Sequence, residues 1–336
     1  MKTIIAGKNE AGQRLDKLLF KVLKKAPKSF VYKMLRKKNI TLNGKKAEGS
    51  EMVNAEDEIK LFLSEETIEK FSDNYVSPLP TTTSEHKAPA SLKENFQVVY
   101  EDTNVLIVNK PAGMLSQKAK ESDVSLVEYV ISYLLDTGSI TLKELETFKP
   151  GICNRLDRNT SGLVAAGKTL AGLKTLSELF RERTLSKYYL CLVKGVIKEE
   201  RKITGYLIKD EKTNQVRILT KAAENADYIE TEYTPVKGNK DYTLLKVKLI
   251  TGKTHQIRAH LSSIGCPIIG DGKYGDKNIN EKFRQKFRLT HQLLHSYEMV
   301  FPKNLQGELN NLSGLQFTAE IPKYFSTIIK ACMNEG

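Results

Sequence analysis

The chain has 336 residues, of which 40% are hydrophobic, and its 53 lysine or arginine residues against 40 aspartate or glutamate residues give a net charge of +13. No apolar run reaches the roughly 18 residues of a transmembrane helix. The N-terminus has only a four-residue apolar patch, which is too short for a secretory signal. We therefore expect a cytoplasmic chain of one large or two smaller domains that does not engage a membrane.

The cysteines are widely spaced. Cys153, Cys191, Cys266 and Cys332 form no Cys-x-x-Cys pair, which argues against a zinc site or a disulfide framework and fits the reducing cytosol. The sequence contains no Walker A loop, Rossmann glycine fingerprint or Gly-x-Ser-x-Gly elbow. It therefore gives no sign of a nucleotide cofactor.

The positive charge is concentrated at the N-terminus. Residues 1–47 hold 14 lysine or arginine residues and 2 acidic residues, so the other 289 residues are nearly neutral. A basic block on a small module is typical of a polyanion binder, and without a hydrophobic anchor a nucleic acid fits better than a membrane surface. The alternative is an ordinary lysine-rich, solvated surface.

The first 63 residues predict a compact α+β module. Apolar spacing indicates helices over 12–23 and 30–37, the second capped by Ser29. The Asn43-Gly44 pair predicts a type I′ hairpin, and residues 58–63 predict a further strand. Residues 64–95 have weak periodicity and contain three prolines, so they predict a linker that lets the module move.

Residues 96–330 predict a second, larger α+β domain. Helices are expected over 123–136 and 170–180 and from residue 255. Strands are expected over 96–100, 105–108, 162–169, 187–195, 215–220, 226–238, 242–252 and 293–301. Strands in hairpins with few helices argue against regular βαβ alternation.

Two stretches of this domain carry candidate functional groups. Residues 151–169 place Asp157 between Arg155 and Arg158. Such an arrangement is normally a structural ion pair, but a desolvated carboxylate can also act as a nucleophile or base. In "KYYLCLVKG", residues 187–195, Tyr188 and Tyr189 point to opposite faces of a strand. One of them could line a site, although a tyrosine in a strand is usually core.

Two more stretches surround these. Residues 251–275 are rich in glycine and gather Lys253, His255, Gln256, Arg258 and His260, donors that suit phosphate groups. Residues 109–117 leave an apolar strand through Lys110-Pro111 and turn at Gly113. That segment is either a loop that shapes a site or a plain connector.

Taken together and in this chain order, the four stretches resemble the RluA-type pseudouridine synthases. The resemblance covers about residues 96–325, is closest to the RluC-like enzymes of large-subunit ribosomal RNA, and extends to an S4 RNA-binding domain over residues 1–63. The family motif His-Arg-Leu-Asp-x-x-Thr-Ser-Gly appears as "NRLDRNTSG", with Asn154 at the histidine. The motif Lys-x-Tyr-x-Ala-x-Val-x-Gly appears with Cys191 at the alanine and selects Tyr189 over Tyr188.

The resemblance implies a mixed, largely antiparallel sheet and the isomerisation of a uridine turned out of the RNA stack. The N1–C1′ bond breaks, and C5 then bonds to C1′. Asp157 would be the essential carboxylate, which either attacks C1′ or removes a C2′ proton. Arg258 would pair with Asp157 and keep it charged, and Tyr189 would stack on the base and help remove the C5 proton. No metal or organic cofactor is needed.

The expected RNA contacts lie in both domains. Arg155, by similarity, would enter the RNA and fill the space that the uridine leaves. The full set of expected RNA-binding residues is Arg155, Thr160, Lys110, His255 and Gln256 in the larger domain and Arg14, Lys17, Lys33, Arg36, Lys37 and Asn43 in the smaller one.

We expect a monomer that acts on 23S ribosomal RNA during large-subunit assembly. One alternative is the same reaction on transfer RNA or another RNA. A second is a non-catalytic RNA-binding assembly factor, which the presence of Asp157, Tyr189 and Arg258 together argues against.

Overall fold

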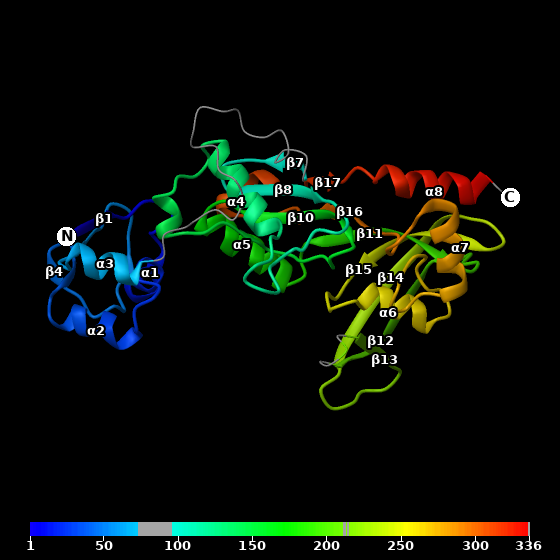
Figure 1. Ribbon diagram of the computed structural model, residues 1–336, viewed down its shortest axis with the longest axis horizontal. Coiled ribbons are helices and arrows are strands. Elements are labelled where there is room, and N and C mark those ends of the chain that lie inside the picture. The colour runs from blue at the N-terminus through cyan, green and yellow to red at the C-terminus, as the bar shows by residue number, and fades with distance from the viewer. Residues whose placement is uncertain (73–95, 211–212, 214, 335–336) are drawn as a thin grey trace.

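The protein is elongated, with an N-terminal module at one end and the C-terminal helix at the other (Figure 1). The computed structural model describes residues 1–72, 96–210, 213 and 215–334. In this part of the chain no helix is long and apolar enough to cross a membrane.

The N-terminal module packs three helices against small antiparallel sheets. Its helices are α1 (Leu15–Val22), α2 (Lys28–Arg36) and α3 (Glu65–Phe71). Its strands are β1 (Lys2–Ile5), β2 (Gln13–Arg14), β3 (Ile40–Leu42), β4 (Lys45–Lys46), β5 (Met52–Val53) and β6 (Glu58–Leu61). The strand order is β1-β6-β3-β4, with β2 and β5 paired separately.

The local predictions for this module are partly right. Asn43 and Gly44 have φ values of 51° and 72°, as the predicted type I′ turn requires. The helix predicted over 12–23 begins only at Leu15, because Gln13 and Arg14 pair with β5. The predicted cap Ser29 is wrong, because α2 already begins at Lys28 with Pro27 at the cap position.

The predicted linker begins with a helix. Ser64 caps α3 by accepting a hydrogen bond from the Thr67 backbone, and the ring of Phe71 lies 4.7 Å from that of Phe30. A seven-residue helix with two packed apolar side chains, Ile68 and Phe71, leaves little periodicity to detect. The prediction of a linker is therefore wrong for these residues, and its remainder, 73–95, lies outside the described residues.

The C-terminal domain is built on one mixed, largely antiparallel sheet, as predicted. Its strands are β7 (Gln97–Glu101), β8 (Val105–Lys110), β9 (Gly151–Ile152), β10 (Ser161–Gly167), β11 (Ser186–Lys194), β12 (Arg201–Asp210), β13 (Gln215–Leu219), β14 (Asp227–Gly238), β15 (Tyr242–Leu249), β16 (Leu294–Val300) and β17 (Gln316–Thr318). The order is β13-β12-β14-β15-β11-β16-β10-β8-β7, with β17 on β16 and β9 on β10. The parallel pair is β10 with β16.

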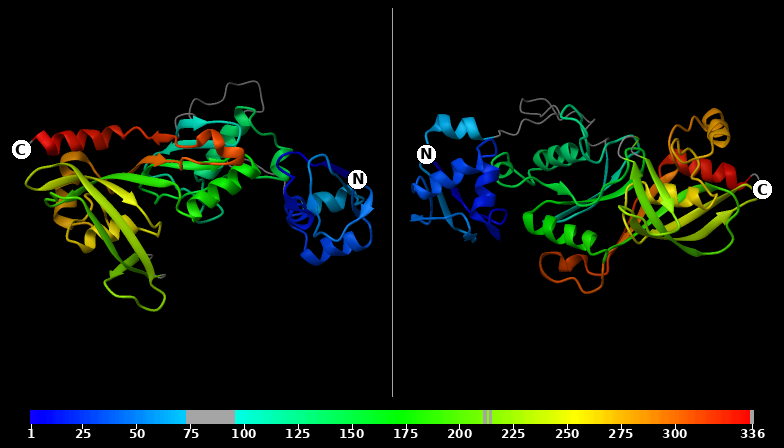
Figure 2. Two further views of the ribbon diagram at one scale, coloured as in Figure 1. Left: turned by 180° about the vertical axis from the view of Figure 1, so that it is seen from behind. Right: turned by 90° about the horizontal axis from the view of Figure 1, so that it is seen from below.

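Helices cover both faces of this sheet (Figure 2). They are α4 (Leu126–Asp136), α5 (Leu170–Arg181), α6 (Gln256–Ser263), α7 (Lys277–Phe287) and α8 (Lys323–Asn334), with short 3₁₀ turns η2 (Glu144–Glu146) and η3 (Gly307–Leu312). One core joins α4 and α6 to Tyr189 and Cys191 of β11. Another joins α7 and α8 to Leu192, on the opposite face of that strand. The sequence patterns did not predict β12, α7 or α8.

The two domains have separate cores and meet through polar contacts. Every member of the N-terminal core lies within residues 4–71. The contacts across the boundary are Lys2 Nζ to Glu146 at 2.5 Å, Lys174 Nζ to the Gly12 carbonyl at 2.8 Å, the Leu170 backbone to Asn9 Oδ1 at 3.0 Å, and Thr147 to Glu10. Because no core spans the boundary, each domain has the apolar interior it needs to fold alone.

Deleting residues 1–72 is predicted to weaken RNA binding more than it slows chemistry on bound RNA. The deletion removes the basic helices α1 and α2, which we expect to contact RNA phosphates, and leaves the larger core intact. Filter binding and single-turnover rates at saturating enzyme measure the two effects separately. A collapsed rate with unchanged affinity would contradict this division of labour.

Candidate active site

Asp157 lies in the turn between β9 and β10, and its carboxylate meets a guanidinium from another element. Nη1 of Arg258, on α6, donates to Asp157 Oδ2 at 2.7 Å. The Asp157 side chain keeps 27% of its exposure, whereas that of Arg258 keeps 7%. The arrangement presents a fixed carboxylate at the mouth of a covered site.

Arg258 is itself held from behind by a second carboxylate. Its Nε donates to Asp271 Oδ2 at 2.7 Å and its Nη2 to Oδ1 at 2.9 Å, a two-pronged pair. The Asp271 side chain is fully buried. Burial lowers the pKa of Arg258, but the hydrogen bonds and charge of Asp271, then those of Asp157, outweigh burial and raise it. Arg258 is thus a permanent cation shared by two carboxylates.

Tyr189 faces this cluster from β11. It is 6% exposed. The pKa of Tyr189 is raised to about 12. Burial is the main cause, a hydrogen bond with Ser296 opposes it, and the negative charge of Asp157 adds to it. The phenol therefore keeps its proton at neutral pH.

His255 completes the wall beside Asp157. Its Nε2 lies 3.9 Å from Asp157 Oδ2, and its Nδ1 lies 2.9 Å from the Tyr274 hydroxyl. That hydroxyl accepts the Val216 backbone N–H at 2.9 Å, so its own proton is free to go to Nδ1. We therefore assign the proton of neutral His255 to Nε2, on the side of Asp157. Burial lowers the pKa of this histidine, although Asp157 raises it.

The segment 110–116 clamps the loop that carries Asp157. Lys110 is fully buried, and its Nζ donates to the carbonyls of Pro111, Met114 and Arg158 at 2.9, 2.9 and 3.2 Å. Ser116 Oγ donates to the Leu156 carbonyl at 2.7 Å and accepts the Leu156 N–H at 3.0 Å. Of the two readings of this stretch, the structure favours the loop that shapes a site.

Gly162 locks the far end of the same loop. It has a φ of 112°, and a Cβ at this position would lie 2.2 Å from the Ser296 carbonyl oxygen. Glycine is needed here because β10 approaches β16 backbone to backbone. Asn154 holds the other side of the turn through the Leu163 carbonyl at 3.1 Å and the Ala165 N–H at 2.9 Å.

Four predicted RNA-binding side chains form hydrogen bonds within the protein, and direct RNA contact by them stays a prediction. Lys110 is buried in the clamp described above. Thr160 is 2% exposed and accepts from Gln292. Gln256 is 2% exposed and bonds Thr251, Glu230 and Thr231. Asn43 bonds Asp57 and the Glu58 backbone within its hairpin.

The other predicted contacts remain accessible. Arg155 is exposed beside Asp157. Lys17 on α1 and Lys33, Arg36 and Lys37 on or next to α2 are also exposed. Arg14 is exposed but already pairs with Asp16 at 2.7 Å.

Sequence reasoning missed two residues that hold the site, Asp271 and Ser116. Asp271 lies in the glycine-rich stretch already singled out, in "IIGDGKYG", where an acid following an apolar strand-like run was a usable signal. Ser116 carried no signal, because its role depends on a contact 40 residues along the chain.

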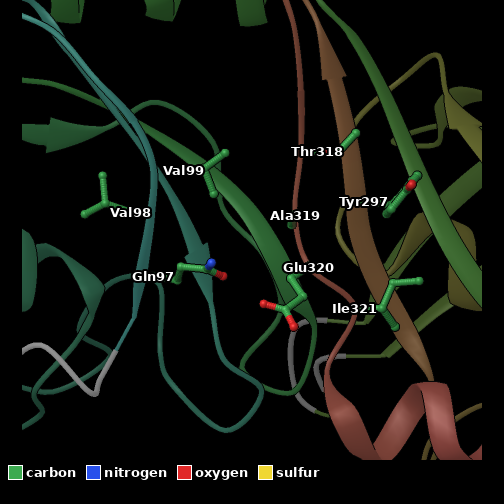
Figure 3. A pocket seen from close by; sticks show the side chains of 8 residues that line it. All are labelled: Gln97, Val98, Val99, Tyr297, Thr318, Ala319, Glu320 and Ile321. Atoms are coloured by element: carbon green, nitrogen blue, oxygen red, sulfur yellow. The ribbon is translucent and has the colours of Figure 1, made fainter.

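An open hollow of about 630 Å³ between β7 and β17 is a separate feature (Figure 3). It contains none of the predicted site residues and one charged side chain, Glu320. Within the described residues no three histidine, cysteine or acidic side chains are gathered as a metal site would need.

Asp271→Asn is predicted to destabilise the protein by about 3 kcal/mol, because it leaves the buried Arg258 without its opposite charge. The pKa of Asp271 is lowered: burial raises it, and the Arg258 contacts more than offset that. Its stabilising contribution is therefore present above the unfolded pKa and is lost as pH falls through the folded value. Urea unfolding at pH 7 and at lower pH measures both effects. Asp157→Asn is the matched control, and equal stability losses in the two variants would contradict the prediction.

Comparison with known proteins gives these elements a family. A model described as "RNA pseudouridylate synthase" matches residues 104–263, and an S4 domain model matches residues 13–59. The chain is 30% identical to an uncharacterized RNA pseudouridine synthase of Mycoplasma genitalium, over 96% of this chain and 97% of that protein. It is 31% identical to the ribosomal large subunit pseudouridine synthase C of Pasteurella multocida, over 92% of this chain and 88% of that protein.

The fold agrees. The structure of human RNA pseudouridylate synthase domain containing 4 superposes with a TM-score of 0.56 at 21% identity, over 70% of this chain and 92% of that one. On the sequence matches, the chain belongs to the RNA pseudouridine synthase family and carries an N-terminal S4 domain.

Proposed function

We propose that this pseudouridine synthase isomerises uridines of 23S ribosomal RNA, with Asp157 as its catalytic carboxylate. The observation that carries the proposal is the Asp157–Arg258 ion pair, 2.7 Å long, at the opening of a site otherwise closed by buried side chains. The relatives named as ribosomal large subunit synthases match this chain over most of its length, which supports the RNA target.

The reaction moves one bond and exchanges one proton. In one route Asp157 bonds to C1′ as the N1–C1′ bond breaks, the uracil turns, and the Asp157–C1′ bond breaks as C5 bonds to C1′. In the other route Asp157 takes the C2′ proton as the N1–C1′ bond breaks, the uracil turns, and the proton returns to C2′ as C5 bonds to C1′. C5 then loses its proton, and N1 ends with a hydrogen, so no oxidant or reductant enters. A carboxylate oriented by Arg258 and partly covered by its neighbours suits either route.

The substrate base must leave the RNA stack to reach Asp157. Arg155 is exposed two residues before Asp157, which supports the proposal that it enters the vacated space. His255, with its Nε2 proton directed toward the same carboxylate, is placed to donate a hydrogen bond to a uracil oxygen as the base turns.

Asp157→Asn is predicted to leave RNA bound and to abolish product. The substitution preserves size and removes the negative charge that both routes require. Pseudouridine formation on a 23S transcript, measured for wild type and variant with binding measured in parallel, is the test. Equal activity of the two proteins would make Asp157 a structural residue, and a product on transfer RNA alone would overturn the proposed target.

Tyr189→Phe is predicted to keep RNA affinity within about two-fold and to slow the single-turnover rate by at least about 10²-fold, the usual range for lost proton transfer. The ring that stacks on the base remains, and only the hydroxyl is lost. Since its pKa is about 12, the hydroxyl acts as a neutral phenol, and the wild-type rate should show no rise from Tyr189 ionisation between pH 7 and 10. Tyr189→Leu, which also removes the ring, is the control and should lose affinity. A Phe variant as fast as wild type would exclude the hydroxyl from proton transfer.

A further inference from the structure

Lys187 is a buried cation that no other part of the site employs. The residue is 8% exposed, yet no described residue offers its ammonium a hydrogen bond or a carboxylate. Phe180 provides one weak contact, with Nζ 5.8 Å from the ring centroid. A charge held this far out of water without an anion is costly and rarely left so.

The ammonium is the part of Lys187 that still reaches solvent. The buried side-chain atoms that lack partners include Thr41 Oγ1 and His291 Nε2 but not Lys187 Nζ. The aliphatic stem is therefore covered while the charged end stays accessible, as a long basic side chain on an apolar surface allows.

Arg183 adds positive charge near Nζ, and the Glu230 carboxylate also lies within electrostatic range of Arg183. Burial lowers the pKa of Lys187, and the positive charge of Arg183 lowers it further. Arg183 is exposed at the turn between α5 and β11, with a φ of 60°. Gly252 also lies near Nζ, where an added Cβ would stand 3.8 Å from it. The absent side chain at Gly252 leaves room beside Nζ, and Lys187 and Arg183 together supply charges that suit an oxyanion.

The position of Lys187 relates this place to the reaction. Lys187 precedes Tyr189 by two residues on β11, so both side chains point to the same face of the sheet. Gly252 begins the segment that leads to His255 and Arg258. Two strand residues span about 6.6 Å, so an anion at Lys187 lies within one nucleotide of a base at Tyr189.

We propose that Lys187, with Arg183, binds a backbone phosphate of the RNA next to the target uridine. The contact would fix the strand on which the uridine turns, without reading its sequence. This inference rests on the proposed function for its RNA, but not on the role assigned to Asp157.

Salt dependence of RNA binding tests the proposal. Loss of one phosphate contact reduces the slope of log K against log salt concentration by about 0.7 to 0.9. If wild type and variant bind equally at about 1 M salt, this change makes binding about five- to eight-fold weaker at 0.1 M salt. We expect this change for Lys187→Met with an unmodified 23S transcript, and for Arg183→Gln in the same direction. Lys187→Arg should restore the slope. Lys330→Met is the matched control, because Lys330 is exposed on α8, which packs on the opposite face of β11.

Stability distinguishes a phosphate site from a packing role. Methionine fills the same space without a charge, so Lys187→Met should have a thermal midpoint equal to or above that of wild type. A lower midpoint with an unchanged slope would overturn the proposal and make Lys187 a packing residue over Phe180. Because the salt slope reports binding and not product formation, an active Asp157→Asn enzyme would refute the catalytic assignment and leave this result intact.

Discussion

The chain of charges from Asp271 through Arg258 to Asp157 is the constraint on which the site depends. A lone buried guanidinium or carboxylate would cost too much free energy. Here the buried Asp271 pairs with Arg258, and Arg258 pairs with the partly exposed Asp157, so only the outer side of Asp157 lacks an opposite charge. Arg258 therefore has one arm that is structural and one arm that faces the reaction. The Asp157 carboxylate is oriented by Arg258, whose own position is fixed by Asp271.

Much of this was predictable from the sequence, and the parts that were not share a cause. The order of motifs identified Asp157, Tyr189 and Arg258, and the structure brings all three together. The alternation of apolar residues predicted most strands of the central sheet. What the sequence does not show is which polar side chains are paired within the protein. Lys110 bonds loop carbonyls beside the site. Thr160 accepts from Gln292, Gln256 bonds Thr251, Glu230 and Thr231, and Asn43 bonds within its own hairpin in the N-terminal module.

The charge of the N-terminal domain was also predicted only in part from the first 47 residues. Residues 1–72 contain 16 basic and 10 acidic residues, so the domain is less basic as a whole than its first 47 residues suggest. The acids lie chiefly from residue 48 onward, after α1 and α2, whereas the exposed cations Lys17, Lys33 and Arg36 lie on those helices. The basic and acidic residues of this domain are thus separated along the chain, which the net charge of the whole domain does not reveal.

The close approach at Gly162 belongs to a short stretch of pairing between the two halves of the central sheet. Among the described residues, the half of the sheet that contains β10, β8 and β7 is joined to the half that contains β11 and β16 through two residue pairs, Ser161 with His295 and Gly162 with Ser296. This short seam begins four residues after Asp157, and two hydrophobic cores that include residues from both halves hold them together across it. Asp157 therefore lies where the backbone pairing of the sheet is shortest and side-chain packing provides most of the connection between the halves.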